Sequence, residues 1–417
     1  MKRIFFIEDE LPNKITYYHL LAFVISLPFD LFYSEVILIS LGIHTAINFR
    51  KDDFKRLKNR NLFILTSLYF LSLVCSLYTT NKDEALFDLT KELGLFIFPL
   101  IFCLTRLNIS KYKDRLLLAF AMTCVCAILY LFIDSIRVIF YYQLPISFLF
   151  SDSFLNQRFS EPLEIHATYL SMYVALSLVF LLYCFTNSAA MQKKVLTGLG
   201  CFILLIGLLQ LASRAVFMAE SIIVIIIFPF FISQKRIRIR FLSTSMLILL
   251  VALILLLKNE SFKERYVEDL KDDFVSNFSS EGRVIRWKTI GELILQRPII
   301  GYGTGSETKI LRAKYLERKL YNSYNYGLNT HSEYLGYLLR AGIIGLFIFL
   351  FVISFGFFCA LKNRDIVFLA FMTIITIVSF SENILDVNKG IFFFGFFFSF
   401  FTFSEGLPDN GRRASTV

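Results

Sequence analysis

Long apolar segments recur along the chain, and they constrain its fold more than any other feature. Most are close to the ~20 residues that a helix needs to cross the hydrocarbon core of a bilayer. Hydrophobic residues fill 56% and charged residues 18% of the 417 positions. Soluble domains contain about 45–50% apolar residues and about 25% charged residues. This composition excludes an ordinary soluble enzyme, a disordered protein and a disulfide-stapled secreted domain, and the segments lack the alternation of transmembrane barrel strands. The sequence therefore predicts an all-α polytopic membrane protein.

We predict about twelve transmembrane helices and one large, partly helical loop on the outer side. The predicted spans are residues 17–33, 34–48, 61–78, 85–103, 116–140, 163–185, 195–212, 215–233, 241–257, 335–360, 366–380 and 390–403. The chain then divides into helices one to nine (1–257), an outer loop domain (258–334), helices ten to twelve (335–403) and a cytoplasmic tail (404–417).

The positive charges support one orientation of these spans. With the N-terminus inside, the inner loops and the tail hold 20 Lys and Arg residues, and the short outer loops hold 4. Because short inner loops are enriched in Lys and Arg, both termini are predicted to be cytoplasmic. This distribution accounts for the net charge of +10 without a nucleic-acid partner, and the predicted surroundings of the chain are a lipid bilayer.

The connection at residues 258–334 differs from all the others. It is 77 residues long and holds 13 Lys or Arg and 11 Asp or Glu residues, and loops of this length in compact proteins are usually functional. Residues 283–294 show helical spacing and end before Pro298, which predicts a helix within the loop. We expect this helix to lie along the membrane surface under Trp287.

Ionisable residues inside transmembrane segments are candidate functional residues, because they are costly there. Arg214 lies where the seventh and eighth spans meet, and it either binds an anion or extends to lipid headgroups. Lys91 lies near the outer end of the fourth span, three residues after Asp88. This spacing allows two arrangements: Lys91 either faces a water-filled cavity or forms a local ion pair with Asp88. Glu220, in the eighth span, lacks an obvious partner in the sequence.

The histidines and glycines give two further patterns. His331 ends the long loop, and imidazole, which ordinarily titrates near neutral pH, is suited to act as a general base there. Four scattered histidines, without an HExxH motif or a CxxC pair, predict no metal site and no cofactor. Gly301, Gly303 and Gly305 follow no predicted strand and precede no GK[ST] motif, which favours a turn over a nucleotide-binding loop.

Three sequence elements occur in order along the second half of the chain. They are Leu-Ala-Ser-Arg-Ala at 211–215, Gly-Arg-Val-Ile-Arg-Trp at 282–287 with Pro-Ile-Ile-Gly-Tyr-Gly-Thr-Gly at 298–305, and Asn-Thr-His-Ser-Glu-Tyr-Leu at 329–335 with Ala-Gly-Ile-Ile-Gly at 341–345. Together they resemble the O-antigen ligase and polymerase superfamily of bacterial envelope glycosyltransferases. The similarity is specific over residues 200–350, and the predicted twelve spans extend it loosely over the whole chain. Family ligases more often carry His-Asn in the third element, whereas Ser332 follows His331 here.

The resemblance implies a reaction and a site. Such ligases transfer a finished glycan from undecaprenyl diphosphate to the lipid A-core oligosaccharide. They act at the periplasmic face of the bacterial inner membrane, invert the configuration and use neither a metal ion nor a nucleotide sugar. Carried over by motif, Arg214 and Arg283 bind the lipid diphosphate, and His331 is catalytic at the acceptor hydroxyl.

The choice among the basic residues stays open in two places. Arg286 competes with Arg283 as the second phosphate-binding arginine, and we prefer Arg283 because it forms an Arg-x-x-x-Trp spacing with Trp287. Lys91 is added to the lipid-diphosphate site, and Arg158 is a second candidate of the same kind, because each adds positive potential on the outer side.

The motifs leave several functions open. The nearest alternative is an O-antigen polymerase, which uses the same donor but transfers to another lipid-linked glycan, and the next is a protein O-oligosaccharyltransferase. The chain length and the single large loop favour the ligase, because many polymerases carry two comparable loops. A lipid-linked sugar transporter, the alternative from a different class, predicts inverted repeats, which the sequence lacks.

Overall fold

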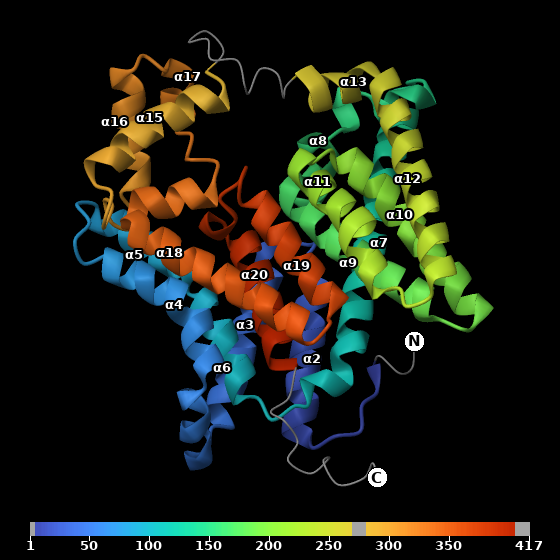
Figure 1. Ribbon diagram of the computed structural model, residues 1–417, viewed down its shortest axis with the longest axis horizontal. Helices are drawn as coiled ribbons and strands as arrows, with labels where there is room; N and C mark the ends of the chain where they lie inside the picture. The colour runs from blue at the N-terminus through green and yellow to red at the C-terminus, as the bar shows by residue number, and fades with distance from the viewer. Residues whose placement is uncertain (1–4, 269–280, 405–417) are drawn as a thin grey trace.

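The computed structural model describes residues 5–268 and 281–404, and all regular secondary structure within these ranges is helical (Figure 1). This confirms the predicted all-α class. The predicted cytoplasmic tail after residue 404 and residues 269–280 of the predicted loop lie outside the described residues.

Helices lie within all of the predicted spans. They are α2 (Leu11–Ser26), α3 (Leu31–Ile47), α4 (Arg60–Cys75), α5 (Lys82–Glu92), α6 (Gly94–Leu104), α7 (Ile109–Tyr141), α9 (Ala167–Asn187), α10 (Met191–Leu211), α11 (Arg214–Ile222), α12 (Lys235–Lys258), α18 (Glu333–Lys362), α19 (Ile366–Val378) and α20 (Asn388–Ser404).

Only some of these helices are long and apolar enough to cross a membrane. Six segments of the described chain meet that condition: α7, α9, α10, α11 with its continuation to Phe231, α12 and α18. A seventh is added if α3 and η1 (Lys51–Lys58), which are bent by 118°, count as one span. The chain therefore has the helices of a membrane protein, and the number of twelve spans stays a prediction.

The predicted span at residues 85–103 is wrong as a single helix. These residues fold as α5 and α6, each 11 residues long, with a break at Leu93. Neither helix reaches the ~20 residues of a full crossing, and only α6 is apolar throughout. The two helices leave the break in different directions (Figure 1).

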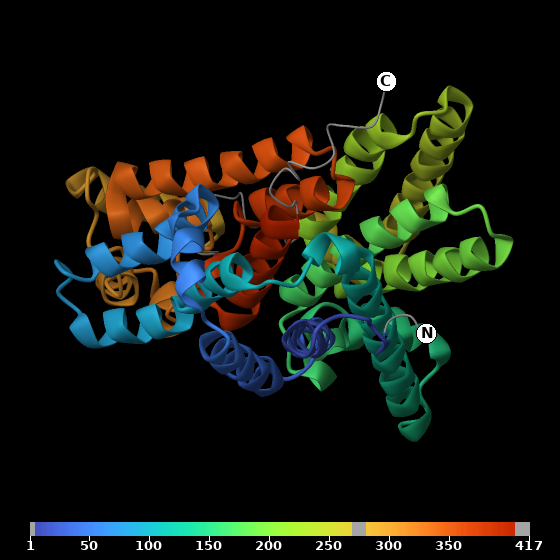
Figure 2. The same ribbon diagram turned by 90° about the horizontal axis from the view of Figure 1, so that it is seen from below.

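The core of the molecule is built around α20, which is phenylalanine-rich and buried on nearly every side. A helix without a polar face is covered either by lipid or by other helices, and α20 is covered by helices, because it packs against α4, α6, α7, α9, α18 and α19. Phe396 illustrates the packing, because its ring lies 4.9 Å from that of Phe23 and 5.8 Å from that of Phe98. In the view from below, α20 and α19 lie between the blue helices α4–α6 and the green helices α9–α12 (Figure 2).

The long loop adds a helical layer at one end of the bundle. α15 (Arg283–Gln296), α16 (Glu307–Glu317) and α17 (Tyr321–Asn325) pack around a small apolar core that includes Ile290, Leu311 and Tyr315. The predicted helix at 283–294 is thus confirmed as α15, while its placement on a membrane surface stays a prediction. α13 (Glu260–Lys263) and η7 (Glu264–Glu268) follow α12 at the same end of the molecule (Figure 1).

The glycine-rich segment forms a turn, as the sequence predicts, and this turn packs against α18. Gly301, Gly303 and Gly305 have φ values of 65°, 94° and 75°, which favour residues without a Cβ. A Cβ on Gly301 would lie 2.6 Å from the backbone of Arg340, so the approach is too close for a side chain. Gly303 N donates to Arg340 O at 2.8 Å, just before α18 kinks at Gly342.

Candidate active site

A cavity of about 490 Å³ lies between the loop layer and the ends of α9, α11 and α19; we call it the arginine cavity. Residues of α9 and α11, of η7, of α15 and of the chain after α19 line it. They are Thr168, Ser213, Arg214, Ala215, Met218, Arg265, Tyr266, Arg283, Val284, Trp287, Phe380, Ser381 and Glu382. The cavity therefore brings together segments that are more than 200 positions apart in the sequence.

Arg214 reaches the cavity because the chain reverses sharply before it. α10 ends at Leu211, Ala212 adopts a left-handed conformation with φ of 44°, and Arg214 is the first residue of α11. The N-terminal end of a helix carries partial positive charge and exposed N–H groups. Arg214 and the start of α11 thus place positive potential on the same wall of the cavity.

Two further arginines line the cavity from the loop layer. Arg283, the first residue of α15, donates to Ser381 O at 3.4 Å, and Arg265 enters from η7. Arg286 is buried in α15, lies near Glu281, and is absent from the cavity lining. Of the two candidates in the second motif, the geometry brings Arg283 to the cavity.

His331 lies beside the cavity and contacts one of its lining residues. Its Nδ1 atom is 3.7 Å from Glu382 Oε2, and 28% of its side chain is exposed. The backbone of His331 has a φ of 45°, which residues other than glycine rarely adopt. Asn329 supports this conformation by accepting from His331 N at 3.1 Å, and Trp287 Nε1 donates to Thr330 O at 3.0 Å.

The charges around Glu382 favour its ionised form. Burial by itself would raise the pKa of Glu382, but the neighbouring His331 and the charges of Arg283 and His166 hold that pKa below its ordinary value. His166 caps α9, and burial lowers its pKa although Glu382 opposes the shift. Glu382 is therefore a carboxylate at neutral pH and is placed to stabilise positive charge on His331.

The chain after α19 also holds the backbone on either side of His331. Asn383 Oδ1 accepts from Ser332 N at 2.8 Å, and Ser379 O accepts from Glu333 N at 2.9 Å. The Glu333 carboxylate in turn accepts from Leu385 N at 2.8 Å. These bonds link the end of the loop to residues 379–385, which fixes His331 relative to Glu382.

A known protein family matches the part of the chain that contains most of these residues. Residues 199–350 match a family model described as O-antigen ligase. This part of the chain is similar to O-antigen ligases. The matched range contains Arg214, Arg283 and His331, and no curated protein that was compared matches the chain.

The matched range does not supply the whole cavity. Thr168 of α9 and residues 380–382 lie outside the matched range 199–350. The apolar helices indicate a membrane protein. Within residues 5–268 and 281–404, no group of three or more His, Cys, Asp or Glu side chains is placed to hold a metal ion.

A buried charged cluster joins residues 199–350 to the rest of the bundle. Arg340 of α18 lies 2.9 Å from Asp386, 3.1 Å from Glu333, 3.5 Å from Glu92 and 4.0 Å from Glu307. We call these five residues the Arg340 cluster. Burial raises the pKa of Glu307, and the charge of Asp386 adds to that effect while Arg340 opposes it. The cluster connects α5, α16, α18 and the chain before α20 next to the His331 segment.

Lys91 and Arg158 do not line the arginine cavity. The ammonium of Lys91 lies 2.7 Å from Asp88 Oδ1 and 4.6 Å from the centre of the Phe87 ring. Of the two possibilities left open by the sequence, this contact favours the local ion pair. Arg158 lies on α8 (Gln157–Ser160).

Reasoning from sequence missed Arg265 and Glu382. Arg265 is one of thirteen basic residues in the long loop, and no motif distinguishes it from the others. Glu382 gave a weak signal, because it is the acidic residue that directly follows the eleventh predicted span on the outer side. Only the folded chain shows that it contacts His331.

Proposed function

We propose that the protein is an O-antigen ligase that transfers a glycan from undecaprenyl diphosphate to the lipid A-core oligosaccharide, with inversion and without a metal ion. The observation that carries the proposal is the placement of Arg214, Arg265 and Arg283 around one cavity, with the pair of His331 and Glu382 beside it. The three arginines can stabilise an anionic leaving group, and the His331–Glu382 pair can remove a proton from a hydroxyl.

The arginines stabilise the charge that develops in the transfer. The bond between the anomeric carbon of the glycan and the diphosphate oxygen breaks, and its electrons stay on the diphosphate. Guanidinium groups form paired hydrogen bonds to phosphate oxygens and keep their charge at any working pH. Cations that are fixed before the reaction lower the barrier most where charge accumulates, which is the leaving diphosphate.

The His331–Glu382 pair provides the base. The acceptor hydroxyl attacks the anomeric carbon and gives its proton to the imidazole of His331. Because Nδ1 of His331 faces Glu382, Nε2 is the nitrogen available to the acceptor. The carboxylate of Glu382 then stabilises the imidazolium, and the proton leaves with the next exchange to solvent.

Loss of one phosphate-binding arginine is expected to slow the reaction strongly. Arg283→Ala should reduce the turnover number by about 10²–10³-fold, because one fixed positive charge at the leaving group is lost. Arg283→Lys should recover part of this loss, since it keeps the charge but not the paired hydrogen bonds. Initial rates with purified protein and lipid-linked glycan measure both variants. Full activity of Arg283→Ala would remove this residue from the diphosphate site.

Loss of Lys91, in contrast, is expected to have little effect on the transfer rate. Because its ammonium pairs with Asp88 away from the arginine cavity, Lys91→Ala should change the transfer rate by less than about twofold, since a distant charge that is already paired adds little potential at the leaving group. The measurement is the same initial rate, with Arg214→Ala as the matched loss of a cation inside the cavity. A comparable loss in both variants would restore Lys91 to the site.

The polymerase alternative differs in the acceptor. If the protein is a ligase, cells that lack its gene should make lipopolysaccharide core without O-chain and should retain long glycan on undecaprenyl diphosphate. Core that carries a single repeat unit would instead identify a polymerase. A normal lipopolysaccharide ladder together with loss of a glycoprotein would identify transfer to protein.

We further propose that the chain lies in the bacterial inner membrane, with the arginine cavity facing the periplasm and both termini in the cytoplasm. The charge distribution among the short loops supports this orientation. A membrane-impermeant thiol reagent should label Asn322→Cys in α17 of intact spheroplasts, and it should label Lys55→Cys in η1 only after lysis. Both positions are exposed. The reverse pattern would contradict the orientation.

A further inference from the structure

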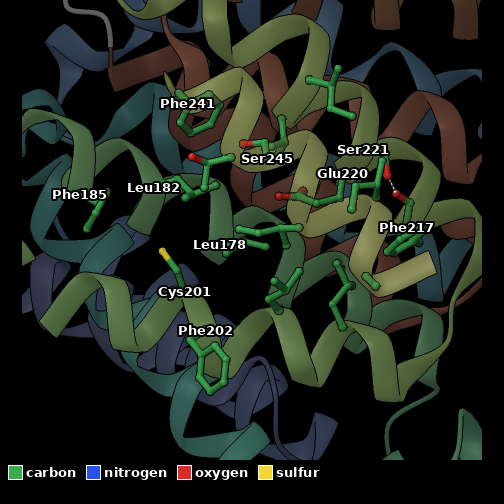
Figure 3. Close-up of a pocket in the computed structure, with 18 of the residues that line it drawn as sticks. Leu178, Leu182, Phe185, Cys201, Phe202, Phe217, Glu220, Ser221, Phe241 and Ser245 are labelled. Atoms are coloured by element: carbon green, nitrogen blue, oxygen red, sulfur yellow. Dashed lines mark hydrogen bonds between the residues drawn. The ribbon is translucent and has the colours of Figure 1, made fainter. Parts of the chain in front are cut away.

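A second cavity lies inside the bundle, away from the proposed reaction site. It has a volume of about 370 Å³, is lined by α9, α10, α11 and α12, and is partly open at its surface; we call it the apolar cavity. Aliphatic and aromatic side chains such as Leu182, Phe202 and Phe241 form most of its wall. Its few polar groups include the carboxyl group of Glu220 and the hydroxyls of Ser221 and Ser245 (Figure 3).

Glu220 is the unusual member of this wall. Its side chain extends from α11 into the space among the labelled residues (Figure 3), and only 5% of the residue is exposed. Neither carboxyl oxygen has a hydrogen-bond partner among the described residues, and no ion pair reaches Glu220 within them. An isolated carboxylate in apolar surroundings is far more costly than the neutral acid. Glu220 therefore offers one hydrogen-bond donor and one acceptor to whatever enters the cavity.

The backbone beside Glu220 is also irregular. The α-helical part of α11 ends at Ile222, and Ile223–Ile227 form a π-helical turn. Such turns are rare and frequently mark functional sites in membrane and soluble helices. The cavity wall continues through this turn to Ile225, so the irregular backbone is part of the same cavity.

The depth of Glu220 indicates which part of a lipid it would meet. Glu220 follows Arg214, the first residue of α11, by six positions, which corresponds to about 9 Å along the helix. The polar interface of a bilayer is about 5–7 Å thick on each side of the hydrocarbon core. If α11 begins at the membrane edge and runs along the bilayer normal, Glu220 lies about 2–4 Å inside the hydrocarbon, just below the interface. The linkages between lipid headgroups and their acyl chains lie at this level.

We propose that the apolar cavity binds an ester-linked acyl chain of a bilayer glycerophospholipid, with the neutral carboxyl group of Glu220 donating a hydrogen bond to the ester carbonyl. The acyl chain fills the apolar part of the cavity from Glu220 toward Gly198 and Phe185. It enters past α12, which has almost no buried residues and leaves its outer face to lipid.

The carboxyl group of Glu220 favours an ester-linked acyl chain over a polyisoprenoid chain as the ligand. A polyisoprenoid tail is hydrocarbon along its length and would leave both oxygens of Glu220 without a partner, at the cost of a buried unsatisfied polar group. An ester carbonyl at the head of an acyl chain satisfies the donor and keeps the rest of the contact apolar. This site is independent of the proposed transfer reaction, and it can be tested by lipid binding without a measurement of glycan transfer.

The test compares two lipids that differ only in the proposed contact. Purified full-length protein is exchanged into detergent with a diacyl phosphatidylglycerol or with its diether analogue, which lacks the carbonyls, and the retained lipid is quantified by mass spectrometry. The wild type should retain the diester about fivefold better than the diether, as expected for one additional hydrogen bond. Glu220→Leu should abolish this preference, and Glu220→Gln, which still has a donor, should keep it.

Four results would overturn the proposal. The first is equal retention of the two lipids by the wild type, and the second is an unchanged preference in Glu220→Leu. The third is displacement of the diester by polyprenyl phosphate at equal concentration, which would assign the cavity to a polyisoprenoid chain. Ala252→Trp, which places a large ring at the cavity wall, should reduce retention of both lipids, and unchanged retention would place the lipid elsewhere.

Discussion

Replacing His331 by alanine is expected to reduce the rate of glycan transfer by about 10²–10⁴-fold, the range that loss of a general base produces. The donor should still bind, because the three arginines of the cavity are unchanged. The loss should therefore fall on the turnover number and leave the apparent affinity for the lipid-linked glycan nearly as it was. Steady-state kinetics with purified protein separate the two parameters.

A matched variant separates the loss of the base from a disturbed backbone. His331 has a φ of 45°, which asparagine adopts more readily than alanine. His331→Asn should therefore keep the local fold and still lose the base, so both variants should be equally slow. Recovery of most of the rate in His331→Asn would contradict the role of His331 as a base and would assign the effect of alanine to the backbone.

Removal of the arginine from the Arg340 cluster is expected to destabilise the fold by about 3–5 kcal/mol, the usual cost of breaking a buried ion pair on one side. Arg340→Met keeps much of the volume but leaves Glu92, Glu307, Glu333 and Asp386 without their shared cation. Thermal unfolding of the protein in detergent, compared at one pH, measures the loss.

An exposed ion pair provides the control for that variant. Arg137 lies 2.6 Å from Asp134 in α7, and 77% of its side chain is exposed, so Arg137→Met should cost less than about 1 kcal/mol. Adding Glu333→Gln and Asp386→Asn to Arg340→Met should restore part of the stability, because two of the stranded acids become neutral. Equal stability of Arg340→Met and Arg137→Met would show that the cluster does not hold the loop layer to the bundle.

The helices were largely predictable from sequence, because apolar length and charged connections act locally. The same reasoning failed at residues 85–103, where α5 and α6 meet at Leu93. Hydropathy does not mark that break, and Pro99 lies inside α6 and not at the break. The charged start of this segment instead belongs to a buried contact, in which Glu92 meets Arg340 across about 250 positions of sequence.

The site was predictable only in part, for a related reason. Arg214, Arg283 and His331 lie in motifs whose residue types suggest anion binding and proton transfer, and the structure brings all three to one region. Glu382 and Arg265 reach that region through tertiary packing, because the chain after α19 and the turn after α12 fold over the start of α11. No local pattern in the sequence encodes such a contact.

The central claim is that the arginine cavity supports transfer of a lipid-linked glycan to a lipid A-core acceptor, and reconstitution tests it most directly. Purified protein in liposomes would receive undecaprenyl-diphosphate-linked glycan and lipid A-core, and products would be identified by mass spectrometry. The account predicts one undecaprenyl diphosphate released for each glycan joined to the core, with no requirement for a divalent cation. Extension of the lipid-linked glycan, or its movement between leaflets without a new glycosidic bond, would contradict the account.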